Sequence, residues 1–219
     1  RALCWGNNQY GQLGVDATTV ANGNATDRST LPVYVEQAAS TSALTGIVAI
    51  SAGDDHTCVV LNDGTAGCFG RNNMSQLGDN TTTDSNKIIS PQEYDPGFAN
   101  LSNIYSIHAN GNSTCAVELT LDGGNNVTDR KGRCWGDNTS GKLGVALGTA
   151  TVGRAKYVRN EGNSADMGSV VSIAVGNTHS CVLRNNGRVK CSGENSNGQL
   201  GDNNSPNDST TPVSVANTA

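Results

Sequence analysis

Residues 47–78 read IVAISAGDDHTCVVLNDGTAGCFGRNNMSQLG, and residues 170–201 repeat this pattern as VVSIAVGNTHSCVLRNNGRVKCSGENSNGQLG. Each copy contains the phrase Gly-x-x-His-x-Cys, a second Cys ten residues later, and a closing Gln-Leu-Gly. Self-similarity over tens of residues is the signature of a repeat architecture, in which each copy forms one structural unit.

The second half of the pattern occurs four times along the chain. Its leading cysteines are Cys4, Cys68, Cys134 and Cys191, which stand 64, 66 and 57 residues apart. The first half occurs three times, because residues 107–115 hold a weaker copy of it. Recurrence in this order predicts a chain built from one unit that repeats in phase.

Each unit is predicted to contain four short strands. In the first complete unit, residues 48–52, 57–61 and 65–70 form short segments bounded by Gly, Asp or Asn, as strands usually are. A fourth strand is expected after each Gln-Leu-Gly phrase, and three of the four candidates open with Pro, which suits a strand start or a sheet edge. These candidates are residues 32–35, 91–94, 155–158 and 212–215. Four strands per unit at this period indicate the blades of an all-β propeller, and no long helix is expected.

At this point the sequence resembles a known family. The phrase G-x-x-H-T-x-x-L…G-x-V-x-x-W-G-x-N-x-x-G-Q-L-G is similar to the regulator-of-chromosome-condensation repeat, and the resemblance covers essentially the whole chain. It implies a seven-bladed β-propeller. The departures are Phe69 and Ser192 in place of the Trp, Ser113 in place of the His, and Lys142 in place of the Gln. The units are also longer than the family's usual repeat, which implies enlarged loops.

The predicted strands divide the chain into an opening half-unit at residues 1–46 and complete units at about 47–103, 104–169 and 170–219. We therefore expect residues 1–219 to form about three and a half of the seven blades. Both ends match the repeat interior and neither has the polar character of a cap, so both should expose strand edges or bare faces. Further propeller sequence, from a longer chain or from a neighbouring subunit, is expected to pack there, and blades from neighbours would make the protein a polymer.

Two cysteine pairs have the same spacing around a predicted turn. Residue 63 lies midway between Cys58 and Cys68, and residue 186 lies midway between Cys181 and Cys191. Each midpoint is the centre of a three-residue turn whose last residue is Gly, which is expected in the left-handed conformation. The paired cysteines therefore face each other across a hairpin, at a separation that a disulfide can span.

The remaining cysteines extend the same scheme. Cys115 and Cys134 are 19 residues apart and are interpreted as the same pair with a longer hairpin tip. Cys4 lacks a partner, whose strand should lie upstream of Arg1. Disulfides would place the protein outside the reducing cytosol, so an extracellular or cell-surface location is expected. The alternative is a cytosolic propeller with buried free thiols, whereas a zinc site would need closer cysteine spacing.

The motifs that imitate catalytic, cofactor-binding or metal-binding sites are explained by the repeat or by solvated loops. We therefore expect no catalytic, cofactor-binding or metal-binding residue and no cofactor. Residues 136–142 imitate a phosphate-binding loop, but Leu143 stands where Ser or Thr would hold magnesium. His56 and His179 share one repeat position, which favours a packing role, and His108 occupies a different one. The Asp- and Asn-rich segments 79–86 and 202–209 carry oxygen ligands that calcium prefers, yet their spacing indicates solvated loops.

The sequence also contains nine Asn-x-Ser/Thr acceptor sequences for N-glycosylation, a mild excess over chance. They are Asn24, Asn73, Asn80, Asn100, Asn112, Asn126, Asn138, Asn203 and Asn207.

Charge argues against a nucleic-acid partner, and hydropathy argues against a membrane span. The chain carries 14 Lys and Arg against 19 Asp and Glu, a formal net charge of −5, whereas a nucleic-acid binder normally has a basic surplus. No apolar run approaches the length of a membrane-spanning helix.

The favoured interpretation is a non-enzymatic extracellular β-propeller scaffold for protein binding, adhesion, or surface or fibre assembly. Binding is expected on the enlarged loops at residues 15–30, 79–90, 119–133 and 145–153, because loops on a rigid scaffold commonly carry function. One alternative, implied by a secreted branch of the family, is an enzyme inhibitor, although the few aromatic residues offer few anchors. A second is guanine-nucleotide exchange, the role of the founding branch, which conflicts with the cysteines and the acidic charge. An enzyme on propeller loops has no supporting feature.

Overall fold

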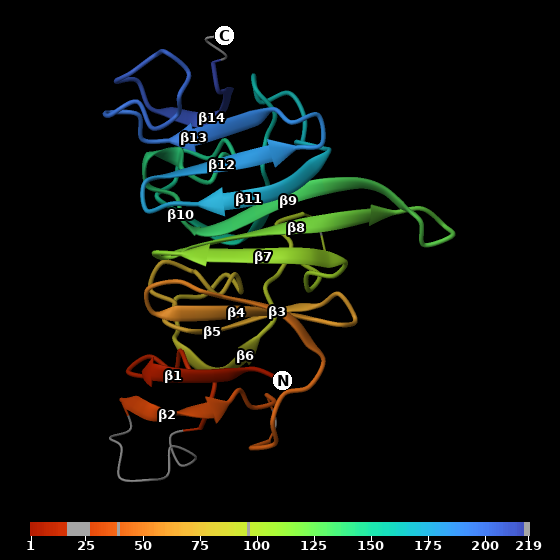
Figure 1. The fold of residues 1–219 in the computed structure, drawn as a ribbon, viewed down its shortest axis with the longest axis vertical. Helices are drawn as coiled ribbons and strands as arrows, with labels where there is room; N and C mark the ends of the chain where they lie inside the picture. The colour runs from red at the N-terminus through yellow and green to blue at the C-terminus, as the bar shows by residue number, and fades with distance from the viewer. Residues whose placement is uncertain (17–26, 39, 96, 217–219) are drawn as a thin grey trace.

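The computed structural model of the chain describes residues 1–16, 27–38, 40–95 and 97–216 (Figure 1). These residues form fourteen β-strands and a single 3-10 turn, η1 (Thr139–Gly141). In chain order the strands are β1 (Leu3–Asn7), β2 (Arg28–Tyr34), β3 (Ile47–Ala52), β4 (His56–Leu61), β5 (Ala66–Gly70), β6 (Ser85–Ile89), β7 (Ile104–Asn110), β8 (Ser113–Leu121), β9 (Val127–Asp137), β10 (Thr151–Tyr157), β11 (Val170–Val175), β12 (His179–Arg184), β13 (Val189–Gly193) and β14 (Ser209–Ser214).

The strands assemble in chain order into four antiparallel sheets. One sheet has two strands, β1 and β2, and is called half-blade 1; the others have four strands each. Blade 2 comprises β3–β6, blade 3 comprises β7–β10 and blade 4 comprises β11–β14. Figure 1 shows the sheets stacked along the long axis, from half-blade 1 beside the N-terminus to blade 4 beside the C-terminus. The all-β propeller-blade architecture predicted from the repeat is thereby confirmed, with three and a half blades in the described part of the chain.

The core lies in the layers between successive sheets. Apolar side chains from blades 2 and 3 form one buried cluster, and those from blades 3 and 4 form a second. A smaller cluster joins half-blade 1 to blade 2 and includes the ring of Phe69. Because successive blades bury the faces that they turn toward each other, stacking rather than any single sheet provides the hydrophobic stabilisation.

A buried asparagine explains why a loop ending in x-Leu-Gly recurs after each Cys-x-Gly. In all four units the Asn Oδ1 accepts a hydrogen bond from the backbone N–H of the Leu five residues later, at 2.9 to 3.1 Å. This bond closes the loop that carries the x-Leu-Gly turn and buries the Leu. The asparagines are Asn8, Asn72, Asn138 and Asn195.

The fourth strands begin earlier than the sequence predicted. In blade 2 the strand is Ser85–Ile89, whereas residues 91–94, the expected strand, lie beyond it. Glu93 instead bridges in parallel to Ala155 of β10, so this segment covers the outer edge of blade 3. Pro32 and Pro212 lie within β2 and β14 rather than at their starts. Both strands are at the outer edge of their sheets, where an absent N–H removes no ladder hydrogen bond.

The hairpin turns agree with the prediction. Gly64 and Gly187 have φ angles of +81° and +76°, the left-handed region expected for the last turn residue. The hairpin of β8 and β9 is longer than the others and projects beyond the stack in Figure 1. Residues 119–133 thus lengthen a hairpin, as the spacing of its two cysteines had indicated.

Candidate functional site

Three disulfides lie at the same place in the three complete blades. The paired sulfurs are 2.10 Å apart for Cys58–Cys68, 2.06 Å for Cys115–Cys134 and 2.11 Å for Cys181–Cys191, with Cα atoms 4.1 Å apart in each pair. All three join directly opposed residues of the two middle strands. The structure therefore contains the three pairs that the sequence predicted. Cys4 is a half-buried free thiol whose pKa is raised by burial.

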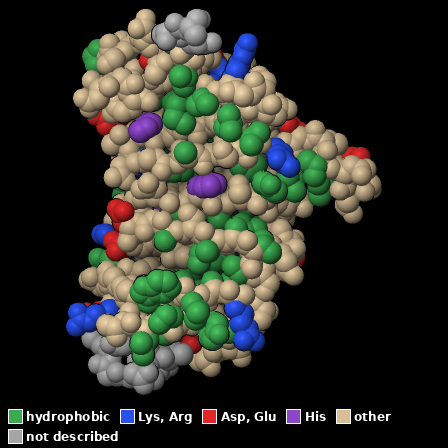
Figure 2. All heavy atoms as spheres, in the orientation of Figure 1, with side chains coloured by type: hydrophobic (Ala, Val, Ile, Leu, Met, Phe, Trp, Pro, Cys, Tyr) green, Lys and Arg blue, Asp and Glu red, His purple; other side chains and the backbone are tan. Residues whose placement is uncertain are grey.

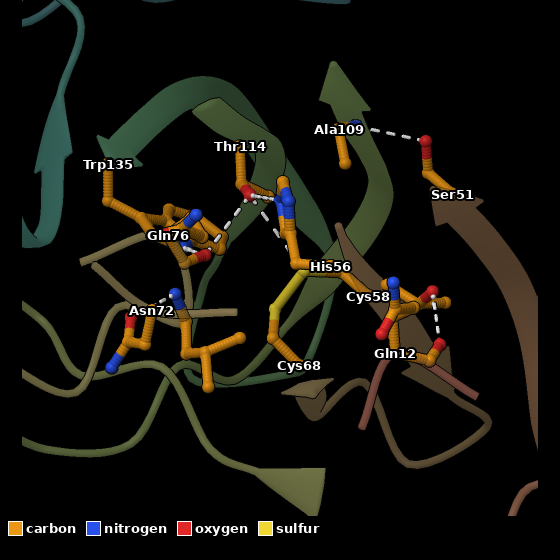
Figure 3. The surroundings of a disulfide bond; sticks show 12 residues. Gln12, Ser51, His56, Cys58, Cys68, Asn72, Gln76, Ala109, Thr114 and Trp135 are labelled. Carbon is orange, nitrogen blue, oxygen red and sulfur yellow. Dashed lines mark hydrogen bonds between the residues drawn. A yellow bond between two sulfur atoms is a disulfide. The ribbon is translucent and has the colours of Figure 1, made fainter. Parts of the chain in front are cut away.

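The first disulfide adjoins a buried polar junction between blades 2 and 3 (Figure 3). The Nε2 atom of His56 lies 2.8 Å from the Thr114 hydroxyl, and the Trp135 indole donates to the backbone oxygen of Gln76 at 2.9 Å. Burial lowers the pKa of His56 from 6.5 to about 4, so the ring is neutral at physiological pH. Because Cys58 is bonded to Cys68, this histidine has no thiolate to activate, and it packs the two blades together.

The phosphate-loop imitation is part of the same scaffold. The ammonium of Lys142 donates to Asp137 Oδ2 at 2.7 Å and to the backbone oxygen of Asn177 at 2.8 Å. Desolvation raises the pKa of the Asp137 carboxyl, but hydrogen bonds from Lys142 and Thr139 outweigh it and lower the pKa below its usual value. The lysine is buried in this pairing and joins blade 3 to blade 4 rather than facing an open loop.

The acidic loops use their carboxylates to hold their own backbone. In blade 2, Asp79 Oδ1 accepts from the Asn72 side chain at 3.0 Å and Asp84 Oδ1 accepts from the Asn72 N–H at 2.7 Å. Asp202 and Asp208 contact Asn195 in the same way in blade 4, at 3.0 and 2.8 Å. In the described ranges, no group of three or more His, Cys, Asp or Glu side chains could hold a metal ion.

The glycosylation candidates differ in access. Asn24 lies outside the described residues, and Asn112 is half-buried, with its Oδ1 accepting from the Gln76 amide at 2.9 Å. Asn138 is 3% exposed, and its side-chain amide donates to two backbone oxygens of its loop at 3.0 Å. It is the structural asparagine of its repeat, so a glycan cannot be attached to it in the folded protein. The remaining six are exposed: Asn73, Asn80, Asn100, Asn126, Asn203 and Asn207.

Two exposed aromatic rings, each beside a half-buried cationic side chain, lie at the outer edge of blade 3. Arg154 lies 4.1 Å from the centre of the Phe98 ring, and Lys156 lies 4.2 Å from the centre of the Tyr94 ring. The two rings are 51% and 45% exposed. We call these four residues the aromatic–cation patch. Their surface combines the aromatic and Arg side chains that protein interfaces favour.

A buried arginine holds the segment that carries the two rings. Arg133 Nε donates to Glu118 at 2.8 Å, and its terminal nitrogens lie 3.1 and 3.5 Å from Asp95 and Glu93. Its guanidinium also stacks 3.7 Å from the centre of the Tyr157 ring. The loop after Pro91 is thereby tied to blade 3, which fixes the position of the aromatic–cation patch.

Sequence reasoning missed the aromatic–cation patch, because residues 94–98 were not among the enlarged loops. A usable signal was present, since the chain has only 2 Trp, 2 Phe and 5 Tyr and two of these aromatics fall within one connection. Segment 79–90, expected to be a loop, contains β6 instead. Of segment 145–153, residues 145–150 connect η1 to β10 and residues 151–153 are the start of β10. Residues 147–150 of this connection line a cleft of ≈ 400 Å³ that also reaches Asp208 and Thr210. Of segment 15–30, residues 17–26 lie outside the described ranges.

Comparisons with known proteins identify the repeat and the fold. Models of the regulator of chromosome condensation (RCC1) repeat match residues 1–60, 47–76 and 170–199. The solved structure of human WBSCR16 is similar with a TM-score of 0.72 and 21% identity, over 97% of this chain and 46% of that one. Prp20p from Saccharomyces cerevisiae is similar with a TM-score of 0.67 and 20% identity, over 99% and 46%. This chain thus spans just under half the length of these two proteins. None of its described helical segments is long and apolar enough to cross a membrane.

Proposed function

This chain belongs to the RCC1-repeat family of β-propellers, and on that premise we propose that it is a non-enzymatic scaffold that binds other proteins in an oxidising, extracellular or cell-surface compartment. Adhesion and assembly of a surface structure are the forms that such binding would take.

The observation that carries this proposal is the repeated cross-strand disulfide. Three cysteine pairs occupy one register in three blades, and each bridges the middle strands of its sheet. Disulfides persist in oxidising compartments and are rare in the cytosol. In the chain-entropy model, closing loops of this size stabilises each blade by about 3 kcal/mol. A cytosolic protein would gain nothing from this arrangement, because its thiols would be kept reduced.

Protein binding is supported by the aromatic–cation patch. Tyr94 and Phe98 are exposed rings next to Arg154, and such residues dominate the energetics of measured interfaces. Their loop is held by the buried Arg133, so little conformational entropy would be lost on binding. Among the similar structures, Prp20p is described together with its binding to Gsp1p and histones, which makes protein binding a known use of this fold.

We also place the described blades in a larger ring, completed by further propeller sequence. On the free face of blade 4, His179 and Gln199 are partly exposed, whereas the corresponding His56 and Gln76 of blade 2 are buried under blade 3. A further blade would bury the first pair in the same way. That the similar structures are about twice as long supports this reading.

Disulfide mapping of the protein from its source tests the proposed compartment. Free thiols are alkylated immediately on harvest, and the protein is then purified and mapped. We expect the three hairpin pairs to be recovered as disulfide-linked peptides, and the protein to be found in the extracellular or surface fraction. Recovery of alkylated Cys58, Cys115 or Cys181 from freshly lysed cells would overturn the proposed location.

Binding is tested by cross-linking to the proteins of the extracellular fraction. A variant with Tyr94→Ala and Phe98→Ala should lose most of the cross-linked partners, because both anchors of the aromatic–cation patch are removed. Tyr105→Ala is the matched control, since Tyr105 is as exposed as Phe98 and also stacks on a cation outside the patch. The guanidinium of Arg130 lies 4.5 Å from the centre of the Tyr105 ring. Equal loss in the two variants, or no loss in either, would show that the patch is not the binding surface.

A further inference from the structure

Strand β1 has an unpaired edge. In the described part of the chain it pairs only with β2, on its outer side. The corresponding strands of the complete blades, β5, β9 and β13, each lie between two partners. A strand with free N–H and C=O groups on one side is a template for the addition of another strand.

Cys4 marks the register that such a strand would take. It faces Val33 of β2, just as Cys68 faces Ile89 and Cys191 faces Val213 in their blades. Those two cysteines, and Cys134 of blade 3, are bonded to a cysteine on the strand at their other side. For Cys4 that side is the unpaired edge.

A cavity lies along the unpaired edge of β1. It has a volume of ≈ 400 Å³ and lies between the edge of β1, with Leu3, Cys4 and Trp5, and the facing surface of blade 2, with Ile50 and Thr57. Figure 2 shows hydrophobic side chains gathered at this end of the molecule. Trp5 is 64% exposed and Leu3 is 45% exposed, whereas Trp135, which corresponds to Trp5 in blade 3, is fully buried.

The complete blades define the chemistry of the occupant. Their second strands read His-Thr-Cys-Val-Val, Ser-Thr-Cys-Ala-Val and His-Ser-Cys-Val-Leu in β4, β8 and β12. The hydroxyl before the Cys donates to the preceding blade, as Thr57 Oγ1 does to the Gln12 oxygen at 2.9 Å and Thr114 Oγ1 to the Gln76 oxygen at 3.3 Å. The residues after the Cys are apolar and buried or partly buried in all three strands.

We infer that the free edge of β1 binds an antiparallel strand of this repeat class, of pattern [His/Ser]-[Thr/Ser]-Cys-[Val/Ala]-[Val/Leu], whose cysteine forms a disulfide with Cys4. The strand comes from the same polypeptide, because in each complete blade the strand at this position directly precedes its partner in the chain. β4 is joined to β5, β8 to β9 and β12 to β13 by a hairpin. The inference rests on the proposed oxidising compartment. The two thiols each give up a proton and together two electrons, which reduce one oxidised glutathione, a small-molecule disulfide, to two glutathione thiols.

Disulfide mapping of the protein from its source tests the inference directly. We expect Cys4 to be linked to a peptide of the stated pattern and reduction to leave the chain's mass on a denaturing gel unchanged. A free Cys4, a partner peptide of another pattern, or a partner released as a separate chain would each overturn the inference. The three hairpin disulfides are read in the same map, so their presence with a free Cys4 would leave the proposed compartment standing.

A strand-addition assay provides a second readout on the 219-residue chain. The probe is a synthetic peptide of residues 176–184, incubated with the chain in glutathione redox buffer. We expect about tenfold more mixed disulfide at Cys4 than with a peptide of the same composition in scrambled order. Cys4→Ser should abolish the adduct. Equal reaction of the two peptides would show that the edge of β1 does not select a strand and would overturn the inference.

Discussion

The buried histidine at the junction of blades 2 and 3 makes the stability of the protein depend on pH. His56 is 1% exposed, its Nε2 contacts the Thr114 hydroxyl, and its Nδ1 has no hydrogen-bond partner in the described structure. Protonation would place an uncompensated charge between two sheets. Burial accordingly lowers the pKa of His56 from 6.5 to about 4.

The magnitude follows from linkage between protonation and folding. Between pH 6.5 and pH 4 the unfolded chain binds a proton at residue 56 that the folded chain does not bind, so the free energy of unfolding falls as the pH falls. A pKa difference of about 2.5 is worth about 3 kcal/mol when each pKa unit counts 1.36 kcal/mol. At pH 4.5 most of this is lost, about 2.5 kcal/mol, while above pH 7 the full contribution is present.

Urea unfolding at pH 7.5 and at pH 4.5, without reductant, measures the effect. His56→Gln removes the titrating group. From pH 7.5 to pH 4.5 the free energy of unfolding of this variant should therefore fall by about 2.5 kcal/mol less than that of the unmodified chain. The loss of the contact with Thr114 is the same at both pH values and cancels in this comparison. His179→Gln, at the corresponding position of blade 4, retains His56. The free energy of unfolding of this variant should therefore fall on acidification as much as that of the unmodified chain. If His56→Gln showed the pH dependence of the unmodified chain, the buried-histidine argument would be refuted.

Three further predictions concern single positions. Gly187→Ala should lower the free energy of unfolding, measured by thermal unfolding, by about 1 kcal/mol, because the φ angle of Gly187 is positive. Gly64→Ala should lower it further, since a Cβ at residue 64 would also lie 3.2 Å from the backbone nitrogen of Asn103. A smaller loss at Gly64 than at Gly187 would contradict this packing. Trp135→Phe should lower the free energy of unfolding by more than the ~1 kcal/mol of the lost indole hydrogen bond, because the smaller ring also leaves part of a fully buried site unfilled. An unchanged urea midpoint would contradict both the bond and the packing. In a glycosylating host, mass mapping of the folded, secreted chain should find Asn138 unmodified while Asn126 remains accessible; a glycan on Asn138 would disprove its structural role.

Much of the fold and part of the site could be read from residue spacing. The disulfides followed from hairpin geometry, because two residues equally distant from a turn centre face each other whatever surrounds them. The fourth strand of blade 2 was misplaced because Pro91 resembled a strand start. The segment after it pairs with Ala155 of the next blade, a long-range contact that local propensity does not encode.

The sequence by itself determined the repeat, the four-stranded blade and the cysteine pairs, because these depend on period, turn residues and register within one hairpin. Only the tertiary structure decided which polar groups are buried and which side chains meet on the surface. Asn138 has the same acceptor sequence as the exposed candidates, yet its loop encloses it. Phe98 and Arg154 are far apart in sequence and meet because Arg133 draws one blade's loop onto its neighbour. Such contacts arise from the stacking of sheets, and stacking depends on the packing of whole faces rather than on the order of residues in any one strand.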